Sequence, residues 1–552
     1  MQLVRHILPS LISPWQLLAM VIAALLLLPM VAILASIFAA DSGVVDHLFT
    51  HVMGRYLGNS ALLLLGVSVC TFILGTTAAW LVTMYQFPLR RFFQLMLLLP
   101  LAMPAYVLAM VYGYLLEPAG PLQSWYRTLS GASYGDYVAP DIRSMVGAIL
   151  VLSFALYPYV YMLARASFAR HSRQVLDSAR LLGVGGWRLF FAVALPIARP
   201  AIVVGVALVG METLADFGVV SLFGIDSFTT AIYRAWYGMG DQIAAAKLSA
   251  MLLVLAAGVL WIERKSRGAA RYDNRTALYH PLPETKLTGL KALIAVGLCC
   301  IPPMVGAFIP MAALIDWSLL RGQGGWADAL TWNAFAHSFM LGISVSLLAL
   351  VIAIYFSIRI RANKASSITR NIMRASALGY AIPGSVIAVG ILIPMLWFDK
   401  WLADTMLTWF DWDIGLLITG SMAGIVFACV VRFMAIALGS VESAFEAVSH
   451  TMDDAAEMLG MGVLKRSVNV HFPIIKKGVG LAAIVLFVDT VKELPATLML
   501  RPFNFDTLSI RTYELAMDEQ LIAAATPALM MVMMALIPVL LLARYGDDLR
   551  EG

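Results

Sequence analysis

Residues Asp177–Pro196 read DSARLLGVGGWRLFFAVALP, and residues Asp454–Pro473 read DAAEMLGMGVLKRSVNVHFP. Seven of the twenty aligned positions are identical when Asp177 is paired with Asp454 and Pro196 with Pro473. Each stretch lies in a charged segment between long apolar runs. A cytoplasmic loop that occurs twice in a duplicated membrane protein indicates a docking device for a partner with two-fold symmetry.

The composition of the chain indicates a membrane protein. Of its 552 residues, 61% are hydrophobic and 13% are charged, whereas soluble proteins are about half apolar and about a quarter charged. The apolar residues gather in runs of about 20, long enough to cross the hydrocarbon core as helices. Lipid requires every backbone polar group to be paired internally, and the alternating pattern of a membrane β-barrel is absent. We therefore expect an all-α integral membrane protein.

Twelve apolar segments are long enough to span a bilayer, six in each half of the chain. The first follows Arg5 and is longer than the apolar core of a cleaved signal peptide. We interpret it as a retained span, with a removed leader as the alternative. The predicted spans are 15–39, 58–85, 92–116, 144–165, 200–222, 244–263, 291–316, 337–358, 375–398, 414–432, 478–500 and 521–543.

The distribution of Lys and Arg predicts the orientation, because these residues favour the cytoplasmic side. If the N-terminus is cytoplasmic, the inner segments hold 28 Lys and Arg and the outer loops hold 8. This ratio predicts a multi-pass protein with both termini in the cytoplasm. The positive net charge reflects this bias and gives no indication of nucleic-acid binding.

The two halves of the chain are predicted to be repeats. Matching landmarks keep nearly the same offset as the doubled phrase along the whole chain, and an even number of spans per half makes the repeats parallel, related by a pseudo-two-fold axis along the membrane normal. We predict a first repeat over 1–265 with a loop at 165–199, a cytoplasmic linker at 266–290, and a second repeat over 291–552 with a loop at 432–477. The landmarks are Asn59-Ser60 with His337-Ser338, 102–110 with 381–389, Asp226 with Asp506, and Gln242 with Gln520.

Each copy of the doubled phrase is predicted to form a short helix on the membrane surface. Asp177 and Asp454 suit the first helical turn, where a carboxylate meets unpaired amides and the positive end of the helix dipole. A glycine then permits a left-handed turn, and a proline stands where the next span begins. The alternative is an ordinary amphipathic loop, which two copies at one spacing disfavour. The apolar face consists of Ala179, Leu181, Leu182, Ala456, Met458 and Leu459.

These loops resemble the signature loop of ABC importer permeases, which reads Glu-Ala-Ala, three residues, Gly, nine residues, Ile, one residue, Leu-Pro. Asp replaces Glu in both copies, and Ser178 and Phe472 depart further, but the spacing from Gly to Pro is intact. The resemblance implies a type I permease fold in the bacterial cytoplasmic (inner) membrane, and coupling helices that seat in two copies of an ABC ATPase subunit. The implied coupling residues are Asp177, Ala179, Gly183, Pro196, Asp454, Ala456, Glu457, Gly460 and Pro473.

We predict no catalytic residue, metal site or cofactor in this chain. It contains no GxxxxGK[ST] sequence, so ATP and Mg would be held by the partner ATPase subunits and the chain itself would be a transport subunit rather than an enzyme. The four cysteines lie in apolar segments without CxxC spacing, and the eight histidines are scattered.

The span after each loop carries unusual charge, which is costly in lipid and typical of a partner contact or a watery pathway. The spacings 212/216 and 489/493 predict that each acidic pair shares one helix face. We expect these faces to line the translocation pathway or to lock the two halves together near its outer mouth. The alternative is a charge pair that stabilises helix packing, with Lys492 as the counter-ion. The candidate residues are Glu212, Asp216, Asp489, Lys492 and Glu493.

The substrate is suggested only by resemblance. The phrases at 212–250 and 492–529 are most similar to the fused permeases of ferric-iron importers, with thiamine, phosphonate, polyamine or sulfate as alternatives. That resemblance implies a periplasmic substrate-binding protein that delivers the cargo. Two other classes stay open. A secondary transporter would have no use for two matched docking loops, and a membrane-embedded enzyme would need converging catalytic groups that the sequence does not display.

Overall fold

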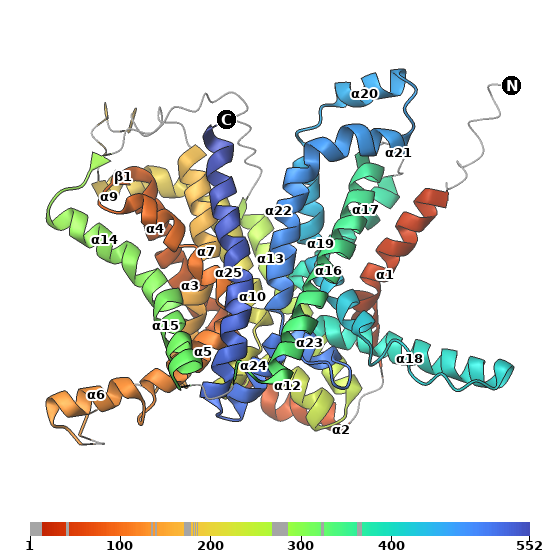
Figure 1. Cartoon of the computed structure of the whole chain (residues 1–552), viewed down its shortest axis with the longest axis horizontal. Helices are drawn as coiled ribbons and strands as arrows, with labels where there is room; N and C mark the ends of the chain where they lie inside the picture. Colours follow the sequence, from red (N-terminus) through yellow and green to blue (C-terminus); the bar gives the residue numbers. More distant parts are fainter. Residues whose placement is uncertain are drawn as a thin grey trace. The chain divides into compact units, whose positions relative to one another are not determined.

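The computed structural model of the chain is almost entirely helical (Figure 1). It describes residues 14–39, 43–133, 136–137, 141–170, 178–179, 181–182, 184, 186–267, 285–321, 325–361 and 367–551. The one pair of strands in this described part is β1 (Tyr85–Gln86) with β2 (Thr285–Lys286), which are parallel and two residues long. The prediction of an all-α integral membrane protein is confirmed.

Contacts divide the chain into two compact units. Unit 1 comprises Met1–Ala40 and His337–Phe505, and unit 2 comprises Asp41–Ala336 and Asp506–Gly552. These units do not coincide with the predicted sequence repeats, since each unit takes helices from both halves. The repeats therefore remain a prediction about the sequence, whereas the units describe how the helices pack.

In unit 1, the helix at the start of the chain packs against helices of the second half. Helix α1 (Pro14–Ser36) packs against α18 (Gly384–Phe410) and α17 (Ser367–Ala375). Helix α19 (Met422–Phe445) packs against α22 (Phe472–Val491). Within this unit, α20, α21 and the start of α1 lie at one end, and α23 lies at the other (Figure 1).

Unit 2 is built around a pair of long helices, α3 (Met53–Met84) and α7 (Met145–Arg170), and α10 (Leu195–Ala215) packs against both. Helices from the second half complete the unit. They are α14 (Leu290–Pro303) on α3, α15 (Ile309–Ile315) on α5 (Ala105–Leu116), and α25 (Leu521–Glu551) on α24 (Leu508–Met517). Helix α1, the first predicted span of the first half, thus packs in unit 1, whose other helices come from the second half. Helices α14 and α15, the first predicted span of the second half, pack in unit 2, which contains most helices of the first half.

The remaining described elements include two further helices long enough to span a membrane, together with shorter connecting elements. They are α2 (Gly43–His47), η2 (Leu48–Val52), α4 (Arg90–Met96), η3 (Leu99–Ala102), α6 (Pro121–Ser130), α9 (Gly186–Leu189), η4 (Phe190–Ala194), α11 (Gly218–Leu222), α12 (Phe228–Tyr233), η5 (Arg234–Gly238), α13 (Gln242–Arg267), η6 (Met304–Phe308), η7 (Asp316–Arg321), α16 (Ala329–Arg361), η8 (Ser376–Ala381), α20 (His450–Met458), α21 (Val463–Arg466), η9 (Ser467–His471) and α23 (Pro495–Leu500).

In the described part of the chain, nine helices are long and apolar enough to cross a membrane, or ten if one bent pair is a single span. The bent pair, Arg90–Ala102 with Ala105–Ser130, turns by 92°. Two further predicted spans are present as helices. Helix α22 has 20 residues and carries Lys476, Lys477 and Asp489, and the apolar part of α25 is Leu521–Leu536. The total of twelve spans remains a prediction.

Several predicted span ends differ from the structure, and two of them stand at a basic residue. The span predicted to end at residue 432 corresponds to α19, which continues to Phe445, and the span predicted to end at residue 165 corresponds to α7, which continues to Arg170. Both predictions place the start of a loop at the first basic residue. Arg432 instead lies inside α19, because it is buried there with a partner.

Candidate coupling loops and charged helix breaks

The second loop forms a short helix capped by a serine. Ser449 is the N-cap of α20, and its hydroxyl accepts the Met452 N–H at 3.4 Å. The acidic residue of the first turn is Asp453, whereas Asp454 is exposed further along the helix. The predicted place of Asp454 in the first turn is therefore wrong, because Ser449 starts the helix one turn earlier than expected.

The end of α20 agrees with the sequence prediction. Gly460 follows the helix with a φ of 72°, a left-handed conformation that favours glycine. The Met461 N–H donates to the Ala456 carbonyl at 3.0 Å, the bond that closes a Schellman-type helix end. Pro473 then stands in the first turn of α22, directly after the π-helical turn η9.

The first loop repeats this turn where the structure describes it. The Val184 N–H donates to the Ala179 carbonyl at 2.9 Å, the counterpart of the bond from Met461 to Ala456. Pro196 occupies the first turn of α10, as Pro473 does in α22. Asp177 and Gly183 lie outside the described residues, so their predicted places stay predictions.

Both loops expose large apolar side chains beside the turn. Leu181 is 89% exposed and Leu182 is 84% exposed in the first loop, while Met458 is 89% exposed and Leu459 is 76% exposed in the second. Ala456, in contrast, is buried. Gathered apolar side chains that face solvent are typical of a protein–protein contact. We call Leu181, Leu182, Met458 and Leu459 the loop tips.

The second loop is also fixed by a charged cluster that the sequence analysis did not identify. Asp453 lies 2.6 Å from Nε of Arg361 and 2.6 Å from Nε2 of His471, and Arg466 Nε lies 3.7 Å from the same carboxylate. Burial by itself would raise the pKa of Asp453. The hydrogen bonds from His471 and Arg361 outweigh burial and hold the pKa of Asp453 below its ordinary value. We call Asp453, Arg361, Arg466 and His471 the loop-2 cluster.

The first charged break follows α10, which ends at Ala215 with Asp216 in an extended conformation. The Asp216 carboxylate accepts the backbone N–H groups of Val219 at 3.1 Å and Val220 at 3.2 Å, so it caps α11. Glu212 lies on α10 before the break. The prediction that Glu212 and Asp216 share one helix face is therefore wrong, because the helix ends between them.

The second charged break has the same construction. Helix α22 ends at Val491, and Glu493 then accepts the Ala496 N–H of α23 at 3.0 Å. Asp489 and Glu493 are again separated by the helix end, so the predicted shared face is wrong here too. Asp489 instead lies 3.3 Å from Lys492, with both side chains partly exposed. This pairing agrees with the alternative in which Lys492 is a counter-ion.

Glu493 has a second partner that the sequence analysis missed. Its other carboxylate oxygen lies 2.5 Å from Nη1 of Arg432 on α19, and the two side chains are 3% and 8% exposed. Gly384, the first residue of α18, lies directly against this pair. A Cβ there would come within 2.5 Å of Glu493 Oε1 and 2.6 Å of Arg432 Nη1. Glycine at 384 therefore makes room for the buried ion pair.

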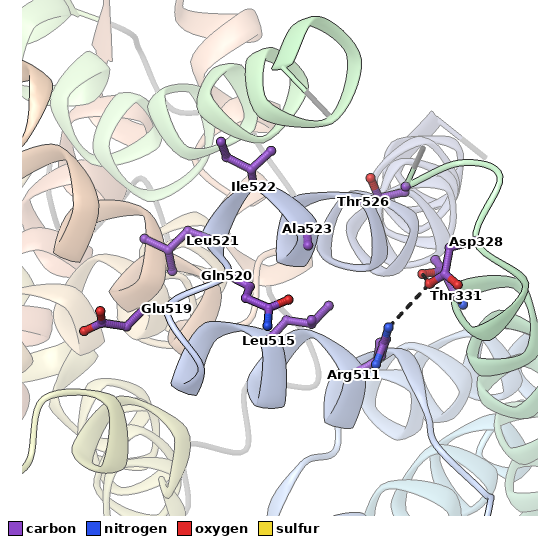
Figure 2. Close-up of a pocket in the computed structure, with 11 residues that line it drawn as sticks. Asp328, Thr331, Arg511, Leu515, Glu519, Gln520, Leu521, Ile522, Ala523 and Thr526 are labelled. Carbon is purple, nitrogen blue, oxygen red and sulfur yellow. Dashed lines mark hydrogen bonds and ion pairs between the residues drawn. The ribbon is translucent and has the colours of Figure 1, made fainter. Parts of the chain in front are cut away.

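A pocket of about 530 Å³ lies in unit 2, between the start of α16 and the turn from α24 to α25. Figure 2 shows Arg511 pointing across it toward Asp328, at 3.5 Å. Asp328 also accepts the Leu330 N–H and the N–H and hydroxyl of Thr331, so it caps α16. Burial by itself would raise the pKa of Asp328. These hydrogen bonds and Arg511 outweigh burial and hold the pKa of Asp328 below its ordinary value. Asp328 and Arg511, which line the pocket, thus stabilise the N-terminus of α16.

Among the described residues, no three His, Cys, Asp or Glu side chains come together as a metal-binding group. The structural features collected so far are a multi-pass helical chain, two loops with the same turn, and two capped helix breaks. They define the class as a multi-pass helical membrane protein with two matching loops between its helices.

Comparison with known proteins narrows this class. A family model described as the inner membrane component of binding-protein-dependent transport systems matches residues 71–264. The chain is 26% identical over 512 residues to the Fe(3+)-transport system permease protein FbpB 2 of Haemophilus influenzae, covering 91% of this chain and 92% of that protein. It is 30% identical over 207 residues to the molybdenum transport system permease protein ModB of Escherichia coli, covering 36% and 87%.

A sulfate transport system permease protein, CysW of Escherichia coli, is 28% identical over 204 residues, covering 37% of this chain and 67% of that protein. The chain belongs to the family of inner membrane components of binding-protein-dependent transport systems and is an ABC importer permease. The family assigns it to transport rather than to catalysis. It also implies a membrane, an ATPase subunit and a substrate-binding protein as partners.

Proposed function

We propose that the chain is the permease subunit of an ATP-driven importer that carries ferric iron across the bacterial inner membrane. The observation that supports the cargo is the extent of one similarity. The match to the Fe(3+)-transport permease spans 512 residues and therefore both predicted repeats, whereas the matches to the molybdenum and sulfate permeases cover about a third of the chain.

We further propose that the two loops each seat in one copy of an ATPase subunit, so that one chain binds two copies. The exposed loop tips supply apolar contacts, and the helix end at Gly460 sets their direction. Within unit 1, the start of α1 lies at the same end as α20 (Figure 1). This supports the prediction that the second loop and the N-terminus lie on the same side of the membrane.

The two breaks suggest which acid meets the cargo. Glu493 is neutralised by Arg432. Asp216 accepts N–H groups of α11, and in the described part of the chain no Lys or Arg forms an ion pair with its carboxylate. A carboxylate without a basic partner is the better contact for a cation in transit, so we propose Asp216 for that role in the pathway.

The cargo is tested by uptake of radiolabelled ferric iron in cells that lack this chain. We expect uptake to fall and to return with the wild-type chain, and excess sulfate, molybdate or thiamine not to compete. Unchanged uptake, in cells shown to lack a redundant iron importer, would reject iron while leaving the permease class in place.

The docking of the loops is tested with exposed residues, whose substitution leaves the core intact. We expect Met458→Gln with Leu459→Gln, and separately Leu181→Gln with Leu182→Gln, each to retain about half of the co-purifying ATPase, because one docking loop remains. Phe503→Gln is the matched control, since Phe503 is 94% exposed and lies outside both loops. Full ATPase retention when all four loop tips are changed would refute the docking proposal.

A further inference from the structure

We propose that Asp453 is a positioning residue for transport, which holds the second coupling helix, α20, against the end of helix α16. The inference rests on the proposed docking function and adds how the docked helix is connected to the membrane domain. It follows from the loop-2 cluster and from the apolar residues that stand at the aligned positions of the first loop.

Asp453 joins two elements that are far apart in the sequence. Its carboxylate is 2.6 Å from Nε of Arg361, the last residue of α16, and the two side chains are 13% and 14% exposed. The same guanidinium donates to the Phe445 carbonyl at 3.1 Å and the Val448 carbonyl at 2.5 Å. Arg361 therefore binds both the end of α19 and the carboxylate of α20.

The other members of the cluster fix the far side of the loop. Nε2 of His471, in η9, lies 2.6 Å from the second Asp453 oxygen, and the imidazole ring packs edge-on against Phe445 at 5.4 Å. Arg466, in α21, lies 3.7 Å from Asp453 and 3.4 Å from Glu457. One carboxylate thus connects α16, α20, α21 and η9, and these connections leave α20 little freedom to move independently of α16.

In its described residues, the first loop is attached by aromatic packing. In the alignment that pairs Asp177 with Asp454, Phe168 stands where Phe445 stands in the second half. The Phe168 ring lies 5.4 Å from that of Trp80, which also contacts Phe190 at 5.1 Å. The residues aligned with Asp453, Arg466 and His471 are apolar, namely Leu176, Leu189 and Ala194.

The two attachments predict different sensitivities. The apolar burial of these rings is non-directional and tolerates small shifts, whereas a partly buried carboxylate between two guanidinium groups and an imidazole holds its partners in one geometry. The movement of a docked ATPase subunit would therefore be passed to α16 through charge contacts in the second loop, and to α3 through apolar contacts in the first.

The test uses the complete permease with its ATPase subunits in proteoliposomes and measures iron transported per ATP hydrolysed. We expect Asp453→Asn to assemble with normal ATPase content and to hydrolyse ATP, while transport per ATP falls about fivefold or more, the lower end for coupling between two sites. We expect Asp453→Glu to recover part of the loss. Glu446→Gln is the matched control, an exposed nearby acid outside the cluster.

Arg361→Lys is the second variant, in case Asp453→Asn does not accumulate. It keeps the charge but loses the planar fork that reaches the carboxylate and both carbonyls, so the same loss is expected. Hydrogen exchange of the α20 amides should quicken in both variants. Unchanged transport per ATP with quickened exchange, or unchanged exchange, would overturn the positioning role. A wild-type complex that contains no ATPase, or that moves no iron, would instead refute the proposed function.

Discussion

The two charged helix breaks have the same backbone construction but different charge environments. After α10 and after α22 the helix ends, and one acidic side chain accepts backbone N–H from the next short helix, two groups for Asp216 and one for Glu493. A threonine hydroxyl donates to the backbone carbonyl of each acid, from Thr229 of α12 to Asp216 and from Thr497 of α23 to Glu493. Glu493 is also paired with Arg432 and buried. The position aligned with Arg432 in the first half is Ala155.

The difference separates two roles that a carboxylate can have in a membrane helix. Capping requires only an oxygen acceptor near free N–H groups, whereas burying the charge requires a partner of opposite sign. Asp216 has the first role, and Glu493 has both. The break after α22 should therefore depend on charge for its stability, and the break after α10 should not.

The largest expected effect is that of removing the basic partner. Arg432→Met leaves Glu493 charged and buried without the Arg432 guanidinium, and breaking a buried ion pair in this way costs about 3–5 kcal/mol. We expect a strong fall in membrane accumulation and in the thermal midpoint of the purified protein. Adding Glu493→Gln should restore much of both, since neither partner is then charged. A double variant no more stable than Arg432→Met would contradict the ion-pair interpretation.

A smaller effect is expected at the glycine beside the pair. Gly384→Ala places a Cβ within 2.6 Å of both charged side chains, and overpacking of this kind costs about 1–3 kcal/mol. The matched control is Ala105→Gly, because Ala105 begins α5 after Pro104 just as Gly384 begins α18 after Pro383. Thermal melting of both variants measures the difference. Equal losses would mean that Gly384 acts through its backbone rather than through space.

The contrast between these breaks also shows which structural features can be predicted from the sequence alone. The apolar runs predict the helices, because a stretch of about 20 apolar residues has few alternatives in lipid. The end of a span is harder to place when a charge is buried inside the helix. Arg432 resembles the start of a loop because its partner Glu493 lies far along the chain, at the break after α22, and no local pattern relates the two.

In the two loops, too, the sequence predicts features that neighbouring residues determine but not contacts between distant residues. The doubled phrase predicts the turn at Gly460 and the start of α22 at Pro473, since glycine and proline act locally. Ser449 could have been recognised as a cap from residue preference alone. Asp453 could not, because its partners Arg361 and His471 lie on other elements, and the alignment draws attention to its neighbour Asp454.

At the break after α10, substitution should affect transport more than stability. Asp216→Asn keeps an oxygen that can cap α11, so we expect a loss of only a few tenths of a kcal/mol, whereas Asp216→Ala removes the cap and costs about 1 kcal/mol. If the charge of Asp216 meets the cation, both variants should reduce iron uptake. Uptake that follows the melting temperature, and is therefore normal in Asp216→Asn, would assign Asp216 to capping alone.

The smallest effect is expected for Asp489 with Lys492, the pair one turn before the buried one. Their side chains are 21% and 16% exposed, so water screens the attraction, and removing such a pair changes stability by about 0–1 kcal/mol. We expect Asp489→Asn with Lys492→Met to melt close to the wild type. A loss as large as that of Arg432→Met would show that burial in the bilayer, rather than exposure within the chain, sets the strength of charge pairs at this break. The stability of the whole end of α22 would then depend on charge, and not only that of the Glu493 pair.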